Sequence, residues 1–355
     1  MASAIVYDVG IEGIVTVVPP KIQSFAQDAQ RLGIDVGQAK RISKSVGLDE
    51  RRVVSADVTA LDLGEVACQD LLRGLDKDSS KIGFIIFVTQ TSDHRQPCNA
   101  AILHGRLGLD TSVGALDVNL GCSGYVYGLY LAATIINSLG KDVLLVVGDT
   151  LSRQVNSMDR SAGILFGDAA SATLLTYRKN ESMYFDLGSD GAGYQSIIVP
   201  AGGARMPSSE KTGISEEDKE GNSRSLDDLK MVGGEVFNFA VRTEPAAILK
   251  LLEFSKTSIE DVDMFFFHQA NKYILRTIAK RLSIPAIKVP DAIITKYGNQ
   301  SSASIPCTIT DTLDAHERPL LCVLSGFGVG LSWGSALCTL NLAYCPSPIT
   351  WSKKK

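Results

Sequence analysis

The chain repeats one pattern of strand, turn and helix, and this repetition constrains its fold more than any other feature. The apolar segment at residues 84–87 returns at residues 264–267, an offset of 180. The turn at residues 119–122 returns at residues 299–302 with the same offset. Two further pairs follow in the same order, 143–148 with 321–326 and 166–172 with 333–338. The shared order predicts two similar halves, although α/β proteins in general also look self-similar.

Short apolar segments rich in β-branched residues alternate with segments of helical periodicity. We expect buried strands at Ile82–Val88, Ala115–Leu120, Val143–Val147, Ala172–Leu175, Val262–Phe267, Leu320–Leu324 and Ala336–Leu342. We expect helices at roughly Asp57–Leu75, Ser123–Leu139, Phe237–Phe254, Asn271–Leu282 and Ser302–Leu313. The alternation predicts an α/β layered fold.

The length of 355 residues is too great for one ordinary hydrophobic core and suits two packed halves. We assign residues 1–180 to an N-terminal half, 235–345 to a C-terminal half and 346–355 to a tail. Residues 181–234 form a polar excursion between the halves. Its part rich in glycine and charge, 202–234, is either a lid over a pocket or a solvated loop. A duplicated fold usually places its active site where the halves meet.

Composition excludes several classes of protein. A net charge of −4 excludes a generally basic nucleic-acid binder. The seven cysteines include no Cys-x-x-Cys pair, so we expect reduced thiols in the cytoplasm and no structural zinc site. We expect neither a signal peptide nor a membrane span, which needs roughly 20 apolar residues. The four histidines include His316 in a polar segment, and their scarcity limits the mechanisms available.

Cys122 lies where a predicted strand turns into a long helix, between Gly121 and Gly124. A thiol at a helix N-terminus is expected to favour the thiolate, because the helix dipole and free N–H groups stabilise negative charge. The arrangement is that of a nucleophile elbow with Cys in place of Ser. A small buried residue at a tight turn is the alternative interpretation.

His268 and Asn299 are two further candidate site residues, both in the C-terminal half. His268 ends the strand at 264–267, where a side chain can reach a crevice at the carboxyl ends of strands and donate or accept a proton. Asn299 occupies the duplicated position of the Cys122 turn and offers an N–H donor that does not titrate. The alternatives are a capping or core histidine and a helix-capping asparagine.

The glycine-rich loop at residues 325–330 follows another predicted strand. It lacks the Lys and the following helix of a phosphate-binding P-loop. Backbone N–H groups that form an oxyanion hole fit this loop better.

Four motifs together resemble the β-ketoacyl-acyl carrier protein synthase III family of the thiolase-like superfamily. They are 121–124 (Gly-Cys-Ser-Gly), 268–271 (His-Gln-Ala-Asn), 298–301 (Gly-Asn-Gln-Ser) and 326–335 (Gly-Phe-Gly-Val-Gly-Leu-Ser-Trp-Gly-Ser). The resemblance extends from about residue 84 to residue 342. The resemblance implies a duplicated α-β-α-β-α sandwich, a homodimer, and catalysis by Cys122, His268 and Asn299. It also implies Phe327, Asn271 and Arg160 as substrate-binding residues.

The resemblance implies a decarboxylating Claisen condensation with no permanently bound cofactor and no metal. Cys122 takes an acyl group from acyl-CoA or acyl-carrier protein, and malonyl-carrier protein then enters. His268 and Asn299 stabilise the enolate formed by loss of carbon dioxide, and the backbone N–H groups of Cys122 and Val329 hold the tetrahedral oxyanion. Elongating synthases have a second His at the position of Asn299, and thiolases have a second Cys in the glycine loop.

Two departures from the family concern the acyl donor more than the chemistry. Arg41 stands where acyl-CoA-priming members often have a Trp, and Val329 replaces a middle glycine of the loop. We therefore expect either fatty-acid synthesis or a specialised acyl or polyketide pathway. The alternatives to condensation are acyl transfer to an oxygen or nitrogen nucleophile, and a non-catalytic subunit of the same fold.

A basic stripe on the helix after His268 gives the remaining prediction. Its residues are Lys272, Arg276, Lys280 and Arg281, of which the first three recur every four positions. Acyl carrier proteins are acidic, so this stripe is a candidate docking face. An ordinary solvated helix face is the alternative.

Overall fold

The computed structural model describes residues 2–315 and 318–353, so His316 lies outside the described residues. The strands are β1 (Ala2–Val18), β2 (Lys21–Ser24), β3 (Glu50–Val53), β4 (Ile82–Val88), β5 (Gly114–Val118), β6 (Asp142–Asp149), β7 (Ala169–Ser189), β8 (Ile197–Ile198), β9 (Glu216–Glu217), β10 (Ser223–Arg224), β11 (Lys230–Met231), β12 (Met264–Phe267), β13 (Leu320–Gly328), β14 (Ser332–Tyr344) and β15 (Ile349–Thr350). The helices are α1 (Phe25–Arg31), α2 (Val36–Ile42), α3 (Ala60–Gly74), α4 (Asn99–Arg106), α5 (Gly124–Leu139), α6 (Gly233–Ser255), α7 (Lys272–Arg281), α8 (Ile293–Tyr297) and α9 (Ser304–Thr312).

Two long antiparallel strands, β1 and β7, run through the two sheet layers of the molecule and join them into one continuous hydrogen-bonded set of nine strands among the described residues. Residues 9–17 of β1 pair with 170–177 of β7, and residues 2–7 pair with 182–187. Between these stretches Asp8 and Asn180 adopt positive φ angles of 56° and 66°. The Asn180 N–H donates to Asp8 Oδ1 at 2.7 Å. Both strands therefore bend at one place, where they leave one sheet and enter the other.

Each half contributes its own strands to one of these sheets. In the N-terminal half, β5, β4 and β6 are parallel, and β6 pairs with the first part of β7 in antiparallel fashion. In the C-terminal half, β12 and β13 are parallel, and β14 lies between β13 and the second part of β7. The strand that would match β5 is replaced by a 3₁₀ turn at Ala286–Lys288.

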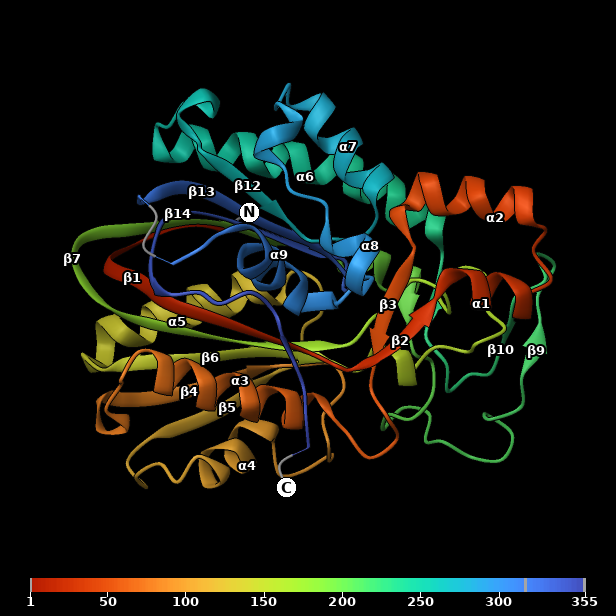
Figure 1. Cartoon of the computed structure of the whole chain (residues 1–355), viewed down its shortest axis with the longest axis horizontal. Coiled ribbons are helices and arrows are strands. Elements are labelled where there is room, and N and C mark those ends of the chain that lie inside the picture. The colour runs from red at the N-terminus through yellow and green to blue at the C-terminus, as the bar shows by residue number, and fades with distance from the viewer. Residues whose placement is uncertain (1, 316–317, 354–355) are drawn as a thin grey trace.

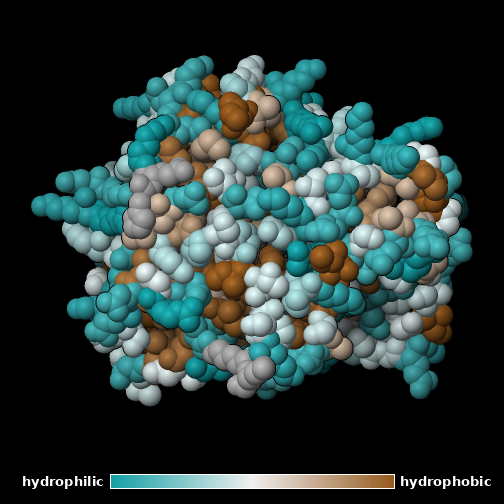
Figure 2. Space-filling view, in the orientation of Figure 1, coloured by the Kyte–Doolittle hydropathy of each residue, from teal (hydrophilic) through white to brown (hydrophobic). Residues whose placement is uncertain are grey.

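Helices and sheets alternate in five layers (Figure 1). Helices α3 and α4 cover the outer face of the N-terminal sheet, and α6 and α7 cover the outer face of the C-terminal sheet. Helices α5 and α9 fill the space between the two sheets and share one hydrophobic core with strands of both halves. The predicted layered α/β sandwich is confirmed. Figure 2 shows a mainly hydrophilic face on which apolar residues form small, separate patches.

The seven predicted strands and five predicted helices all correspond to elements of the structure. The sequence did not predict β1, because glycines at 10 and 13 and charges at 8 and 12 interrupt its apolar pattern. Its length comes from pairing with β7 rather than from local propensity. The predicted boundary at residue 180 falls inside β7, so the division of the chain there stays a prediction.

The predicted excursion and tail are both attached to the rest of the protein. In the excursion, Asn222 is buried, and Arg224 forms an ion pair with Asp159 at 3.2 Å. In the predicted tail, β15 pairs with β1, and the Trp351 N–H donates to Val18 O at 2.8 Å. The tail is therefore part of the sheet up to this point, and residues 354–355 lie outside the described residues.

Candidate active site

Cys122, His268 and Asn299 line one cavity of about 350 Å³ between the two halves. Cys122 precedes α5, His268 follows β12, and Asn299 precedes α9. Backbone hydrogen bonds tie the halves together here: the Asn299 N–H donates to Leu165 O at 2.9 Å, and the Gly167 N–H donates to Asn299 O at 3.0 Å. His268 lies 146 positions after Cys122 in the sequence, and Asn299 lies 31 positions after His268, yet all three line the cavity at the junction of the halves that the repeat predicts.

The glycine loop at residues 325–330 packs directly against Cys122. A methyl group added at Gly328 would lie 2.9 Å from Cys122 Sγ, so no larger residue fits without movement. The Val329 carbonyl accepts a 2.7 Å hydrogen bond from Ser332 Oγ, which fixes the loop. A backbone hydrogen bond from Val329 reaches the Cys122 sulfur and lowers its pKa. The predicted backbone donors are therefore adjacent to the nucleophile.

The expectation of a thiolate at Cys122 does not hold for the free protein. Burial raises the pKa of Cys122 to about 12, and the charge of Asp149 adds to this effect. The Ser301 hydroxyl and the N–H groups of Cys122 and Val329 act in the opposite direction, but burial outweighs them. The resting nucleophile is a thiol, so acylation requires a base.

His268 is a neutral imidazole held by α9. Its side chain is buried, and burial lowers its pKa to about 3. Phe327 packs against the ring edge-on, with ring centroids 5.6 Å apart. The Nδ1 atom lies 2.8 Å from Ser304 Oγ. In the described part of the chain, Nε2 makes no protein hydrogen bond and is free for chemistry in the cavity.

The hydroxyl of Ser304 determines which nitrogen of His268 carries the proton. It lies 2.8 Å from Ser301 O and 2.8 Å from His268 Nδ1, and it also accepts the Gln269 N–H at 3.2 Å. When Ser304 donates to Ser301 O, it accepts from Nδ1–H and leaves Nε2 as a base. When the hydroxyl turns to donate to Nδ1, Nε2 carries the hydrogen and becomes a donor.

Asn299 has a fixed orientation. Its Oδ1 accepts the Ser301 N–H at 2.9 Å. Because the oxygen is engaged, the Nδ2 amide group presents its hydrogens to the cavity that Asn299 lines. The result is a permanent N–H donor beside His268.

The three predicted substrate-binding residues also line this cavity. Phe327 packs on His268. Asn271 caps α7, because its Oδ1 accepts the Ile274 N–H at 2.8 Å. Arg160 donates to Leu32 O at 3.1 Å from the opposite wall. Leu229 and Met231, from the excursion 202–234, line the cavity as well, as the lid interpretation expects.

Sequence reasoning missed two polar residues that support the site, Ser304 and Asp149. Asp149 is fully buried at the end of β6 and accepts the Gln90 N–H at 2.7 Å. Burial raises its pKa to about 6 against hydrogen bonds from Gln90, Ser301 and Thr89. Charged residues are rarely fully buried unless they are paired, so a carboxylate ending an apolar strand was a signal that sequence could have offered.

The predicted basic stripe is only partly free. Lys272 and Arg276 lie 3.5 Å and 3.6 Å from Asp291, and Arg281 donates to Val241 O at 2.6 Å. Arg276 and Lys280 are exposed on the outer face of α7. The stripe begins next to the cavity, because α7 starts one residue after Asn271.

Within residues 2–315 and 318–353, no helix is long and apolar enough to cross a membrane. The same residues include no group of three or more His, Cys, Asp or Glu side chains arranged to hold a metal ion.

Comparisons with known proteins agree on one family. Residues 116–191 match the model of 3-oxoacyl-[acyl-carrier-protein] synthase III, and residues 252–340 match the model of its C-terminal part. A Campylobacter jejuni protein assigned as a 3-oxoacyl-[acyl-carrier-protein] synthase 3 is 37% identical over 325 residues, 90% of each chain. A 3-oxoacyl-(acyl-carrier protein) synthase crystal structure from Burkholderia xenovorans has a TM-score of 0.91 and 35% identity over 99% of both chains. The priming β-ketosynthase of the R1128 polyketide pathway has a TM-score of 0.80 and 25% identity over 96% of this chain and 97% of its own.

Proposed function

The chain belongs to the 3-oxoacyl-[acyl-carrier-protein] synthase III family and is a condensing acyltransferase of that type, and we propose that Cys122, His268 and Asn299 carry out its reaction. One observation supports this assignment above all. A partly exposed thiol, a neutral imidazole and an oriented amide from both halves line the same cavity, next to backbone donors of the glycine loop.

The first step transfers an acyl group to Cys122. His268 Nε2 accepts the thiol proton while the sulfur forms its bond to the substrate, so that no free thiolate–imidazolium pair precedes the attack. The sulfur attacks the thioester carbonyl, and the Cys122 and Val329 N–H groups stabilise the oxyanion. The carbon–sulfur bond of the donor then breaks, and the leaving thiolate takes the proton back from His268.

The second step uses the other tautomer of His268. Proton exchange with water after the first product leaves removes the proton from Nδ1 and adds one at Nε2, and Ser304 then donates to Nδ1. Nε2–H and the Asn299 amide both donate to the malonyl thioester oxygen. Carbon dioxide leaves, and its bonding electrons form an enolate that these donors stabilise. The enolate carbon attacks the acyl-Cys122 carbonyl, and the carbon–sulfur bond to Cys122 breaks. The β-ketoacyl thioester is released, and the Cys122 thiolate takes a proton from water to return to the resting thiol.

The acyl donor is an acyl-CoA or acyl-carrier protein, and the extender is malonyl-carrier protein. Arg160 in the cavity wall and the exposed Arg41 on α2 are positive groups suited to a phosphate-bearing donor. Arg276 and Lys280 on α7 suit an acidic carrier protein. We propose that its product enters either fatty-acid synthesis or a specialised acyl or polyketide pathway.

A homodimer is proposed from the edge of the N-terminal sheet. β5 pairs with β4 on one side only, and its five residues are half-buried rather than exposed. A short apolar edge strand of this kind pairs readily with a second copy of itself. The seven free cysteines favour a reducing compartment, and we propose the cytoplasm.

Intact-mass measurement after incubation with a panel of acyl-CoA and acyl-carrier-protein donors tests the proposal. The expected result is one acyl adduct on the wild-type protein, none on Cys122→Ala, and the same adduct on Cys98→Ala. Cys98 is the matched control because it is the other partly exposed cysteine. An adduct that persists in Cys122→Ala would overturn the assignment.

A further inference from the structure

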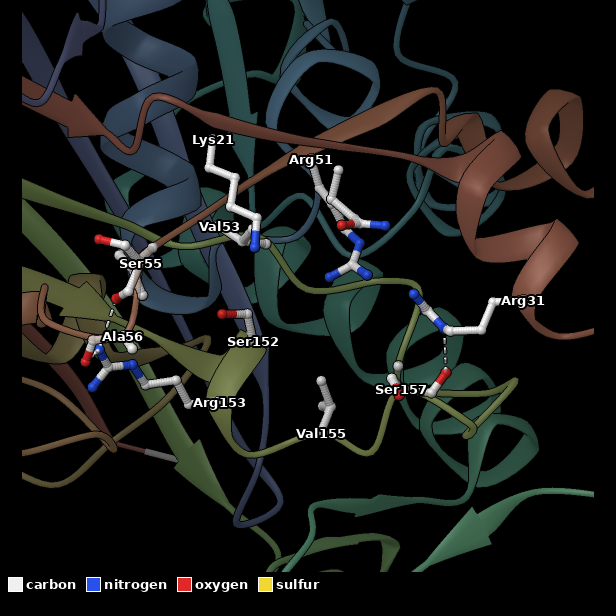
Figure 3. Close-up of a pocket in the computed structure, with 13 residues that line it drawn as sticks. Lys21, Arg31, Arg51, Val53, Ser55, Ala56, Ser152, Arg153, Val155 and Ser157 are labelled. Carbon is white, nitrogen blue, oxygen red and sulfur yellow. Dashed lines mark hydrogen bonds between the residues drawn. The ribbon is translucent and has the colours of Figure 1, made fainter.

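A second pocket, about 260 Å³ in volume, lies outside the active-site cavity on the far side of the 152–163 loop. It is bounded by β2, β3, the end of α1 and this loop. Four cationic side chains and no carboxylate line it: Lys21, Arg31, Arg51 and Arg153. Figure 3 shows the nitrogens of Lys21, Arg31 and Arg51 extending toward one central space, whereas Arg153 turns toward Ser55 and Ala56.

The four cationic side chains that line this pocket outnumber the two buried carboxylates next to it, Asp28 and Asp168. Asp28 is buried and pairs with both Arg31 and Arg51, at 2.5 Å and 2.9 Å. Asp168 is buried behind Ser152 and accepts its hydroxyl at 2.5 Å. Among the described residues, no carboxylate forms an ion pair with Lys21 or Arg153.

Lys21 and Arg153 therefore retain unused donors. Lys21 is exposed at the pocket, and its ammonium makes no hydrogen bond to the described part of the protein. One nitrogen of Arg153, Nη2, donates to three backbone carbonyls, at 2.6 Å to Val58 and at 2.8 Å and 3.0 Å to Ala56 and Ser55. Its other nitrogens make no such bond there. Preorganised arginines with free N–H groups favour a tetrahedral oxyanion that accepts from several directions.

The 152–163 loop connects this pocket to the active-site cavity. On the pocket side, Arg31 Nε donates to Ser157 O at 3.2 Å. On the cavity side, Arg160 donates to Leu32 O at 3.1 Å, the residue after α1. Two hydrogen bonds thus connect the loop and the end of α1, one on each side of the loop. An anion bound by Arg31 would therefore restrict the movement of the loop that carries Arg160.

We propose that this pocket is a second anion site, distinct from the catalytic cavity, which binds a small phosphate-bearing ligand. Lys21 Nζ and Arg31 Nη1, for which the described residues provide no hydrogen-bond partner, bind the phosphate oxygens. Arg51 supplies fixed positive charge, and Ser152 and Ser157 line the wall. Occupation of the site stabilises the arrangement of the 152–163 loop that Arg160 shares with the acyl-donor cavity.

Isothermal titration calorimetry with inorganic pyrophosphate, at constant ionic strength, tests this proposal without any assay of catalysis. We expect saturable one-site binding to the wild-type protein. Lys21→Gln/Arg31→Gln should bind about tenfold more weakly or worse, because two charge-assisted contacts are lost. Lys179→Gln/Lys219→Gln is the matched control, since it removes the same charge from exposed sites elsewhere and should bind like wild type.

The variants were chosen to preserve the fold, because Asp28 keeps Arg51 when Arg31 is removed. Lys21→Gln alone provides a second variant that removes no hydrogen bond or ion pair between described residues, and we expect it to weaken binding as well. The proposal is overturned if the wild type shows no saturable binding, or if pocket and control variants bind alike. Malonate in place of pyrophosphate should bind more weakly, and equal affinity would contradict the assignment to phosphate.

Discussion

At the scale of the residue, the nucleophile Cys122 is a protonated thiol in the free protein at neutral pH. Its position at the start of α5 supplies the expected dipole, but burial has the larger effect on the pKa of Cys122. The neutral state of His268 has the same physical cause. Two neutral groups in a closed site avoid the desolvation cost of a thiolate–imidazolium pair until the substrate arrives.

The alkylation of Cys122 by iodoacetamide should therefore depend steeply on pH. With a pKa of about 12, the thiolate fraction and the rate should rise about tenfold per unit between pH 7 and pH 10. Peptide mass spectrometry of the labelled site provides the rate, with a free thiol as the reference. A plateau below pH 9 would contradict the assigned thiol state.

The sequence identified Cys122 and His268, because each follows a recognisable strand and begins a turn, and it identified Asn299 because the turn at Cys122 is repeated there. It did not identify Ser304 or Asp149, whose roles depend on contacts across the fold rather than on a local pattern. It also assigned Cys122 the wrong ionisation state, since the depth of burial cannot be read from neighbouring residues.

At the scale of the element, helix α6 carries a buried acid that the chemistry does not use. Glu244 is fully buried against the C-terminal sheet, and burial raises its pKa from 4.5 to about 8, with the Ser325 hydroxyl acting in the opposite direction. The folded protein holds this proton to a higher pH than the unfolded chain. The resulting stability is complete below pH 4.5 and is lost as the pH rises toward 8.

Glu244→Gln should remove this pH dependence. The wild-type protein should lose up to about 5 kcal/mol of unfolding free energy between pH 4.5 and pH 8 from this group, and the variant should not. Urea unfolding at several pH values measures the difference. Glu253→Gln, an exposed position on the same helix, is the control, and equal pH profiles for the two variants would refute the prediction.

Helix α7 offers a separate test of carrier-protein docking. Reversal of charge in Arg276→Glu/Lys280→Glu should raise KM for malonyl-carrier protein about tenfold and leave KM for acyl-CoA nearly unchanged, because only the protein substrate meets this face. Lys179→Glu is the control. A parallel rise in KM for both substrates would indicate damage to the cavity instead of lost docking.

At the scale of the whole molecule, the repeat in the sequence becomes two sheets joined by β1 and β7. The layered fold was predictable, because strands and helices of both halves alternate in one order. The bends at Asp8 and Asn180 were not, since they reflect the passage of paired strands from one sheet to another. The repeat also did not predict that the described C-terminal half lacks a strand equivalent to β5 and has a 3₁₀ turn at Ala286–Lys288 instead.

The edge strand β5 therefore occurs only in the N-terminal sheet among the described residues, and it is the strand that we expect to pair with a second copy of the chain. Light scattering after size-exclusion chromatography should give twice the chain mass of 38.0 kDa. The dimer should persist upon dilution to micromolar concentration, as expected for pairing of edge strands with apolar support. A particle of the monomer mass would contradict the proposed pairing.

The central claim is that one cavity performs both acyl transfer to Cys122 and decarboxylative condensation. The most direct measurement loads the protein with an acyl group, adds malonyl-carrier protein labelled in its free carboxylate, and follows labelled carbon dioxide and the β-ketoacyl product together. The account predicts equal amounts of both from wild type, with Asn299→Ala retaining the acyl adduct but losing both products. Discharge of the acyl group without carbon dioxide release, or unchanged condensation in Asn299→Ala, would contradict it.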